Sequence, residues 1–254
     1  MRGPIELLTA SFELFKNHWK LFLGIFAIPG LVTAIVDYYS ATHPVSNVYG
    51  AEYPLPMIVV SIIMVLALFA MQIALSKAVS APNETTIKSA YQFAQKYFLQ
   101  YILLSIMVGF VILLGTLALI IPGIIFAVWF GFSYFVLIFE GKKGVDAMKA
   151  SKAYVKGHWW AIVGRIVVLM FVMIALSIIT GIGGKILGMV FPHAILIAVV
   201  SFVTSFVAMP IAIAYAYFMY VDLKKVNAVS PAIAVVSSPE NQPQTPAPVN
   251  AETV

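Results

Sequence analysis

The sequence predicts an all-α integral membrane protein, and three observations lead to this prediction. Hydrophobic residues make up 62% of the 254 residues and charged residues only 10%, whereas an average soluble domain carries roughly 25% charged residues. The mean hydropathy of +0.99 is incompatible with a water-soluble core under a solvated shell. The apolar residues also form long runs without strand-like alternation, which favours membrane helices over a membrane barrel.

Six stretches are long and apolar enough to cross a bilayer, which takes about 20 residues for each helix. The third and fourth stretches are separated only by the turn around Pro122-Gly123, which predicts a tight helical hairpin. The expected spans lie at roughly 21–39, 57–77, 98–118, 121–139, 160–180 and 194–221.

We expect residues 1–226 to form the membrane domain and residues 227–254 to form a disordered cytoplasmic tail. After Asn227 the chain is rich in Ser, Pro, Ala, Val, Gln and Asn and has no lysine or arginine. Such a composition offers too few packing residues to fold alone. The first 20 residues alternate polar and apolar character, so they are not expected to be a cleavable signal.

Lysines and arginines are divided unequally between the two sides of the expected bundle. Thirteen lie in four segments on one side of the bundle: before the first span, between the second and third, between the fourth and fifth, and after the sixth. Only Lys185 lies on the opposite side, and Arg165 falls inside the fifth span. The positive-inside rule then predicts an inner-membrane protein with both termini in the cytoplasm. We therefore assign the net charge of +5 to topology, and no nucleic-acid partner is expected.

A short amphipathic segment precedes each odd-numbered span, and the three segments can be overlaid. They occupy 8–19, 87–98 and 148–159, and the first and third share Ala, Ser, Lys, His and Trp in register. The overlay predicts three parallel repeats, each made of an interfacial amphipathic helix followed by two spans. The repeats are expected at about 4–80, 83–140 and 144–222.

The first amphipathic segment shows how such a helix is expected to lie. Ile5, Leu8, Phe12, Phe15 and Trp19 fall on one helical face, and polar residues fall on the other. We expect the apolar face to lie among the acyl chains at the cytoplasmic interface. Each segment is then expected to turn into the membrane at an aromatic residue, which is Trp19, Phe98 or Trp159-Trp160.

Several motifs resemble a known bacterial family of multi-span membrane proteins of unassigned role. The motifs are Pro122-Gly123-Ile124-Ile125-Phe126-Ala127-Val128-Trp129-Phe130, Phe139-Glu140-Gly141, Ala147-Met148-Lys149-Ala150-Ser151 and Lys156-Gly157-His158-Trp159. That family is similar to the membrane domain fused to some glycerophosphodiester phosphodiesterases. The resemblance is best over about residues 85–180 and implies a six-span inner-membrane protein. Phosphodiesterase activity is not implied, because the motifs that match are membrane-entry and turn patterns without chemistry.

Arg165 is the one clear charge inside a span, and it is a candidate site residue for that reason. It lies about one turn from the cytoplasmic interface, so its side chain can snorkel to the lipid headgroups. Glu140 and Asp222, at cytoplasmic ends of spans, are the candidate ion-pair partners of Arg165. Anchoring to a headgroup and a role in binding a substrate both remain open.

The loop from Glu140 to Trp160 is the best candidate surface for a partner. It carries five lysines against Glu140 and Asp146, and a basic segment at the anionic inner leaflet attracts lipids. A membrane or cytoplasmic protein partner would use the same residues. The candidate lipid or partner contacts are Arg165, Lys149, Lys152, Lys156, Trp19, Trp159 and Trp160.

No catalytic, cofactor-binding or metal site is expected. His18 and His158 recur at one repeat position, and His43 and His193 both fall on the outer side. We favour a structural role for these histidines, because neither pair has carboxylate or cysteine ligands beside it. The chain has no cysteine and no HExxH or GxSxG pattern, so we do not expect an enzyme.

Two classes of function fit these features. The first is an accessory or scaffold protein that contacts lipids or a partner through its cytoplasmic interfacial helices. The alternative is a permease for a small or lipidic solute, which would need a continuous polar lining. The available lining residues are Gln72, Thr116, Ser133, Ser177, Thr180, Ser201, Thr204 and Ser205.

Overall fold

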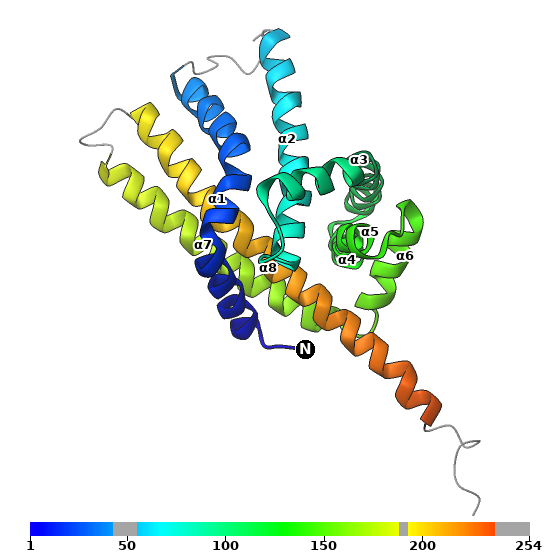
Figure 1. The fold of residues 1–254 in the computed structure, drawn as a ribbon. Coiled ribbons are helices and arrows are strands. Elements are labelled where there is room, and N and C mark those ends of the chain that lie inside the picture. Colours follow the sequence, from blue (N-terminus) through cyan, green and yellow to red (C-terminus); the bar gives the residue numbers. More distant parts are fainter. Residues whose placement is uncertain (43–54, 188–192, 237–254) are drawn as a thin grey trace, which may run out of the picture.

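The computed structural model describes residues 1–42, 55–187 and 193–236, and every element in these ranges is a helix (Figure 1). The predicted all-helical class is therefore confirmed. The helices are α1 (Pro4–Thr42), α2 (Leu55–Ser80), α3 (Ile87–Ala118), α4 (Ile120–Phe130), α5 (Ser133–Glu140), α6 (Gly144–Val155), α7 (Trp159–Leu187) and α8 (His193–Val236).

Six helical stretches in the described ranges are long and apolar enough to cross a membrane. This confirms the expected number of spanning stretches by length and composition. They are Pro4–Tyr39, Ile58–Ser80, Ile87–Ala118, Ile120–Glu140, Trp159–Gly184 and Ala198–Ala228.

The helices that carry the amphipathic segments are interrupted at two of the three expected turns. His18 has non-helical backbone angles inside α1, with φ −124° and ψ 22°. In the third segment α6 ends at Val155 and α7 begins at Trp159, with Gly157 at φ +84° in the turn. A positive φ of this size is accessible to glycine without strain. α3 instead runs without a break through the second segment.

The fourth spanning stretch is not one continuous helix. It consists of α4 and α5, which are separated by a turn at Gly131 and Phe132. Beside this turn, the buried hydroxyl of Ser151 in α6 donates a hydrogen bond to the carbonyl of Trp129 at 2.6 Å. A broken helix is tolerated in a membrane where backbone groups near the break find partners, and α6 supplies one here.

The main core lies where the first part of α1, the ends of α2 and α5, and the second half of α8 come together. Leu7, Leu75, Leu137 and Leu223 represent these four elements, and each is almost completely buried. Away from this region the helices expose long apolar surfaces; α7 is the most exposed of the spanning stretches. Such surfaces are stable when acyl chains cover them, because lipid tails are as apolar as leucine.

The α3–α4 hairpin runs in a different direction from the other long helices. Figure 1 looks almost straight down the second part of α3 and down α4, whereas α1, α2, α7 and α8 run across the picture. Near the hairpin turn the two helices pack closely at glycines: a Cβ on Gly115 would lie 3.2 Å from the Cα of Gly123 and 2.6 Å from the Phe126 ring. Small residues of this kind let two membrane helices pack closely.

Two local expectations differ from the structure. α8 continues to Val236, beyond the predicted start of the tail at residue 227; residues 237–254 lie outside the described ranges. Once a helix is nucleated, each added residue contributes a further hydrogen bond, so it can extend past the membrane segment. The face of α6 expected among acyl chains packs on protein instead, with Ala147 and Val155 fully buried.

Candidate functional site

Charged and phenolic side chains gather where the ends of α5, α6 and α8 meet the start of the chain and α7. We call this group the polar end cluster. Its members are Arg2, Glu140, Lys142, Tyr154, Arg165, Tyr220, Asp222 and Lys224.

Glu140, the last residue of α5, is the centre of one half of the polar end cluster. Its carboxylate accepts hydrogen bonds from the hydroxyls of Tyr154 at 2.8 Å and Tyr220 at 2.7 Å. It also pairs with Lys142 at 3.0 Å and Lys224 at 3.4 Å. Its side chain is only 10% exposed, so these four partners compensate the loss of hydration. Glu140 thus joins α5, α6 and α8.

Tyr154 extends this junction from α6. Burial, followed by the hydrogen bond to Glu140 and the charge of Glu140, raises the pKa of Tyr154 to about 12. The hydroxyl therefore stays protonated and acts as a donor at physiological pH. The backbone carbonyl of Tyr154 accepts a hydrogen bond from Asn227 Nδ2 at 3.1 Å, so α6 is attached to α8 at two points.

Asp222 of α8 is the centre of the other half of the cluster. It accepts hydrogen bonds from the Arg2 backbone N–H at 2.8 Å and from Arg2 Nη2 at 2.9 Å. Arg2 Nε lies 3.1 Å from the same carboxylate, and the guanidinium lies 4.8 Å from the ring centre of Phe218. A guanidinium fork on a carboxylate is among the stronger side-chain hydrogen-bond arrangements. The start of the chain is thereby fixed to the end of the sixth span.

The structure corrects the predicted ion pairs of Arg165. Asp222 pairs with Arg2 and Glu140 pairs with two lysines, and neither carboxylate pairs with Arg165 in the described ranges. Arg165 instead donates from Nε at 3.0 Å and Nη2 at 2.7 Å to the carbonyl of Arg2. Arg2 is the nearer cation to Asp222 because the first residues fold back over α8. Arg165 contributes by holding that backbone in place.

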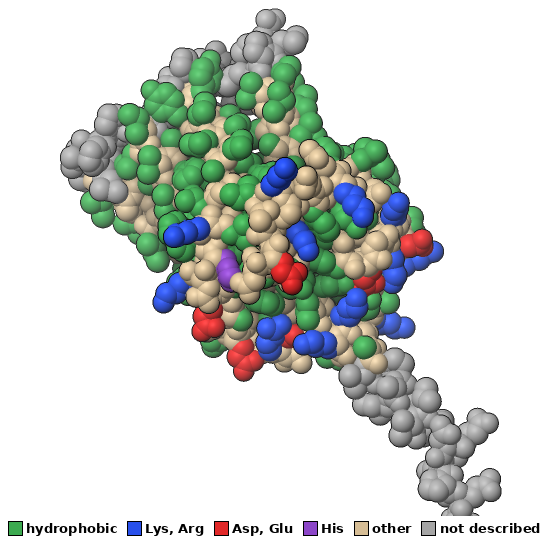
Figure 2. Space-filling model, viewed as in Figure 1, with side chains coloured by type: hydrophobic (Ala, Val, Ile, Leu, Met, Phe, Trp, Pro, Cys, Tyr) green, Lys and Arg blue, Asp and Glu red, His purple; other side chains and the backbone are tan. Residues whose placement is uncertain are grey.

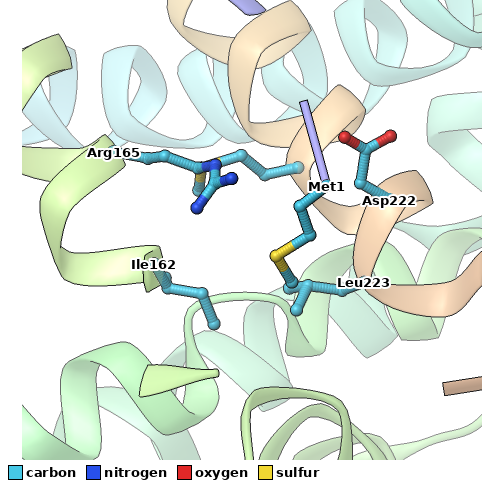
Figure 3. Close-up of a pocket in the computed structure, with 6 residues that line it drawn as sticks. Met1, Ile162, Arg165, Asp222 and Leu223 are labelled. Carbon is cyan, nitrogen blue, oxygen red and sulfur yellow. The ribbon is translucent and has the colours of Figure 1, made fainter. Parts of the chain in front are cut away.

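A small cavity separates Arg165 from Asp222. Met1, Ile162, Arg165, Asp222 and Leu223 line it, and its volume is about 10 Å³, which is room for about one water molecule. Figure 3 shows Arg165 on one side, Asp222 on the other, and the side chain of Met1 between them. The intervening methionine is a further reason why the two charges do not meet.

The three lysines predicted as lipid or partner contacts are exposed on or just after α6. Lys149, Lys152 and Lys156 all point away from the buried face of this helix. Lys152 Nζ lies 4.1 Å from the centre of the Trp129 ring, within the range of a cation–π interaction. The structure therefore gives Lys152 a packing role beside α4 in addition to its charge.

The predicted aromatic contacts differ in their exposure. Trp160 is 80% exposed and Trp19 is 45% exposed, whereas the indole N–H of Trp159 is buried without a hydrogen-bond partner among the described residues. Trp159 and Trp160 meet edge to face at 4.7 Å. Of the three, Trp160 is the one most accessible to lipid.

The histidines occupy the turns between interfacial and spanning segments. His18 lies at the kink in α1 and His158 in the turn before α7. The described ranges contain no group of three or more His, Cys, Asp or Glu side chains that could hold a metal ion. The outer pair includes His43, which lies outside the described residues.

Two similar sequence motifs contain the carboxylates of the polar end cluster. In each motif a carboxylate at the end of an even-numbered span is followed, two residues later, by two lysines. The motifs are Glu140-Gly141-Lys142-Lys143 and Asp222-Leu223-Lys224-Lys225. The pattern indicates equivalent carboxylates at one membrane interface. Nothing comparable indicated that Arg2 would be the partner of Asp222, because the two are joined only by the tertiary fold.

Comparisons of the chain with protein-family models, with curated proteins and with solved structures found no match.

Proposed function

We propose that this protein is an accessory or scaffold protein of the cytoplasmic membrane, with its basic end in the cytoplasm and in contact with lipids or a partner protein. One observation carries the proposal: basic side chains gather at one end of an otherwise apolar molecule. Figure 2 shows Lys and Arg side chains over the end from which α8 projects, while the rest of this face is largely apolar. An apolar body with a basic end is the pattern that the positive-inside rule describes.

The contact between Arg2 and Asp222 supports the proposed topology. It joins the first residues of the chain to the end of the sixth span at 2.9 Å. Two chain ends that meet in this way fit an even number of crossings, which would leave both on one side of the membrane. This topology requires the α3–α4 hairpin to cross the bilayer as well, although in the structure it runs in a different direction from the other long helices (Figure 1). Its exposed apolar residues, such as Leu117 and Ile121, then face lipid.

Burial at equivalent positions supports the threefold repeat. Ser11, Ala90 and Ser151 occupy one position of the overlay, and each is fully buried. At a second position of the overlay all three residues are also buried; they are Phe22, Tyr101 and Ile162. At a third position Ile25 and Leu104 are fully buried, whereas the third repeat has Arg165. The repeats thus share a packing pattern, and Arg165 is the departure from it.

The apolar interior favours the accessory role over a permease. Among the described residues the buried polar side chains are Ser11, Ser76, Thr85, Ser133, Ser151 and Asp222. Of the residues available to line a pathway, Thr116 and Thr180 bond to carbonyls of their own helices. Hydroxyls in such bonds are satisfied within one helix and supply no continuous polar surface. We propose neither a catalytic activity nor a cofactor for this chain.

Native mass spectrometry of the protein released from nanodiscs tests the proposed function. We expect wild type to retain anionic lipid or a stoichiometric protein, and to lose it when Lys149, Lys152 and Lys156 are changed to glutamine. Each basic residue near an anionic surface contributes on the order of 1 kcal/mol, so three changes weaken a purely electrostatic contact by roughly 100-fold. Retention of a small polar solute that is unaffected by these changes would contradict the accessory role and favour the permease.

A further inference from the structure

A groove with an apolar floor opens between α3, α4 and α6. Met107, Phe110 and Val111 of α3 face Met148 of α6 across it, and Phe130 comes from the end of α4. Its volume is about 420 Å³, within the range of about 300–1,000 Å³ that small-molecule sites occupy.

Two lysines form the polar part of the groove lining. Lys149 and Lys152 are three residues apart on α6, so they are neighbours on one helical face. No acidic side chain lines the groove, and neither lysine is paired with a carboxylate in the described ranges. The groove therefore combines an apolar floor with uncompensated positive charge.

The surroundings of the groove indicate what occupies it. Phe110 is 59% exposed, and Ile106 and Leu113 beside it on α3 are similarly exposed. The groove is thus continuous with an apolar helix surface that acyl chains cover in a membrane. A soluble partner would have to displace those chains to reach the floor, whereas a lipid of the surrounding bilayer would not.

We propose that this groove binds one anionic phospholipid, with an acyl chain along Met107, Phe110 and Val111 and the phosphate at Lys149 and Lys152. The assignment rests on the proposed function, because it needs α6 to lie at the cytoplasmic headgroup level. The lysines recognise the charge of the phosphate. The apolar floor replaces the contacts that the acyl chain would otherwise make with other lipids in the bilayer. Trp129, under the ammonium of Lys152 at 4.1 Å, holds that lysine at the groove.

The test uses the full chain in nanodiscs of phosphatidylcholine that contain phosphatidylglycerol as a minor component. Native mass spectrometry counts the lipids that remain bound after release. We expect Lys149→Gln with Lys152→Gln to weaken phosphatidylglycerol retention roughly 30-fold and to leave phosphatidylcholine retention unchanged. The matched control is Lys88→Gln with Lys96→Gln, which removes the same charge from exposed positions of α3 outside the groove and is expected to behave like wild type.

A second variant tests the apolar floor without changing charge. Val145 lines the groove and is 50% exposed, so Val145→Trp fills the groove without disturbing the core. We expect it to lose phosphatidylglycerol about as strongly as the double lysine variant does, at an unchanged melting temperature.

Three results would overturn the assignment. Equal losses of phosphatidylglycerol in the two double lysine variants would show general attraction to a basic surface. The proposed function would then stand, but the groove assignment would not. Full retention of phosphatidylglycerol by Val145→Trp would also exclude the groove. If wild type retained no excess of phosphatidylglycerol, the groove assignment would fail, and so would lipid contact by the basic end.

Discussion

Glu140→Ala is expected to destabilise the protein by about 3 kcal/mol, mainly because two tyrosine hydroxyls lose a charged acceptor and each such hydrogen bond contributes about 1.5–3 kcal/mol. The two lysine partners are 47% and 51% exposed, so water hydrates their freed ammonium groups and they add little. The change leaves the hydroxyls of Tyr154 and Tyr220 without their acceptor and leaves Lys142 and Lys224 without their counter-ion. For a chain of this size the melting temperature falls by roughly 10 °C. Tryptophan fluorescence during heating of the protein in nanodiscs measures the shift.

The matched control is Glu140→Gln, which keeps an acceptor oxygen for the two tyrosines and removes only the charge. We expect this variant to lose about half as much stability as the alanine variant. A melting temperature for Glu140→Ala equal to that of wild type would show that the junction of α5, α6 and α8 does not depend on this carboxylate.

Asp222→Ala is expected to release the first residues of the chain from α8, at a cost of about 1.5–3 kcal/mol, the range for hydrogen bonds to charged groups. Arg2 is 35% exposed, so solvent hydrates its freed guanidinium and the loss lies toward the lower figure. Arg165 alone then holds the Arg2 backbone. Because the chain has no cysteine, a spin label attached to Ile5→Cys reports the mobility of this segment.

The label is expected to move faster in Asp222→Ala than in the native background. Glu13→Ala serves as the control, because Glu13 is exposed on α1 and forms no ion pair with a described residue. A double-mutant cycle between Arg2→Ala and Asp222→Ala measures their coupling. Zero coupling, with an unchanged label spectrum, would exclude the Arg2–Asp222 contact as the anchor of this segment.

The helical class and the six spanning stretches were predictable because they depend on local composition. Hydropathy and run length are properties of neighbouring residues, so a span such as α7 can be located without knowing its contacts. The kink at His18 and the turn before Trp159 were also expected, since an aromatic residue ends each polar segment. The break between α4 and α5 was not expected, and the Ser151 hydroxyl that bonds to the Trp129 carbonyl beside it comes from another helix.

The candidate site was predicted less well than the fold. Arg165 was singled out as a charge inside a span, and in the structure it makes long-range hydrogen bonds to the Arg2 carbonyl. The predicted ion-pair partners of Arg165 were wrong. The sequence does not reveal that Arg2 folds back onto Asp222 and offers its own carbonyl to Arg165. Which long-range pairs form is decided by how the helices pack, and one sequence contains no direct record of that packing.

Single-cysteine labelling in the cysteine-free chain tests most directly whether the basic end of this protein faces the cytoplasm. Lys156→Cys lies at the basic end, Ile120→Cys at the turn of the α3–α4 hairpin, and Ser46→Cys between the first two spans. A membrane-impermeant maleimide is applied separately to spheroplasts and to inverted membrane vesicles. We predict that Lys156→Cys is labelled only in inverted vesicles, and Ile120→Cys and Ser46→Cys only in spheroplasts. Labelling of Lys156→Cys in spheroplasts would contradict the orientation, and labelling of Ile120→Cys in inverted vesicles would contradict six crossings.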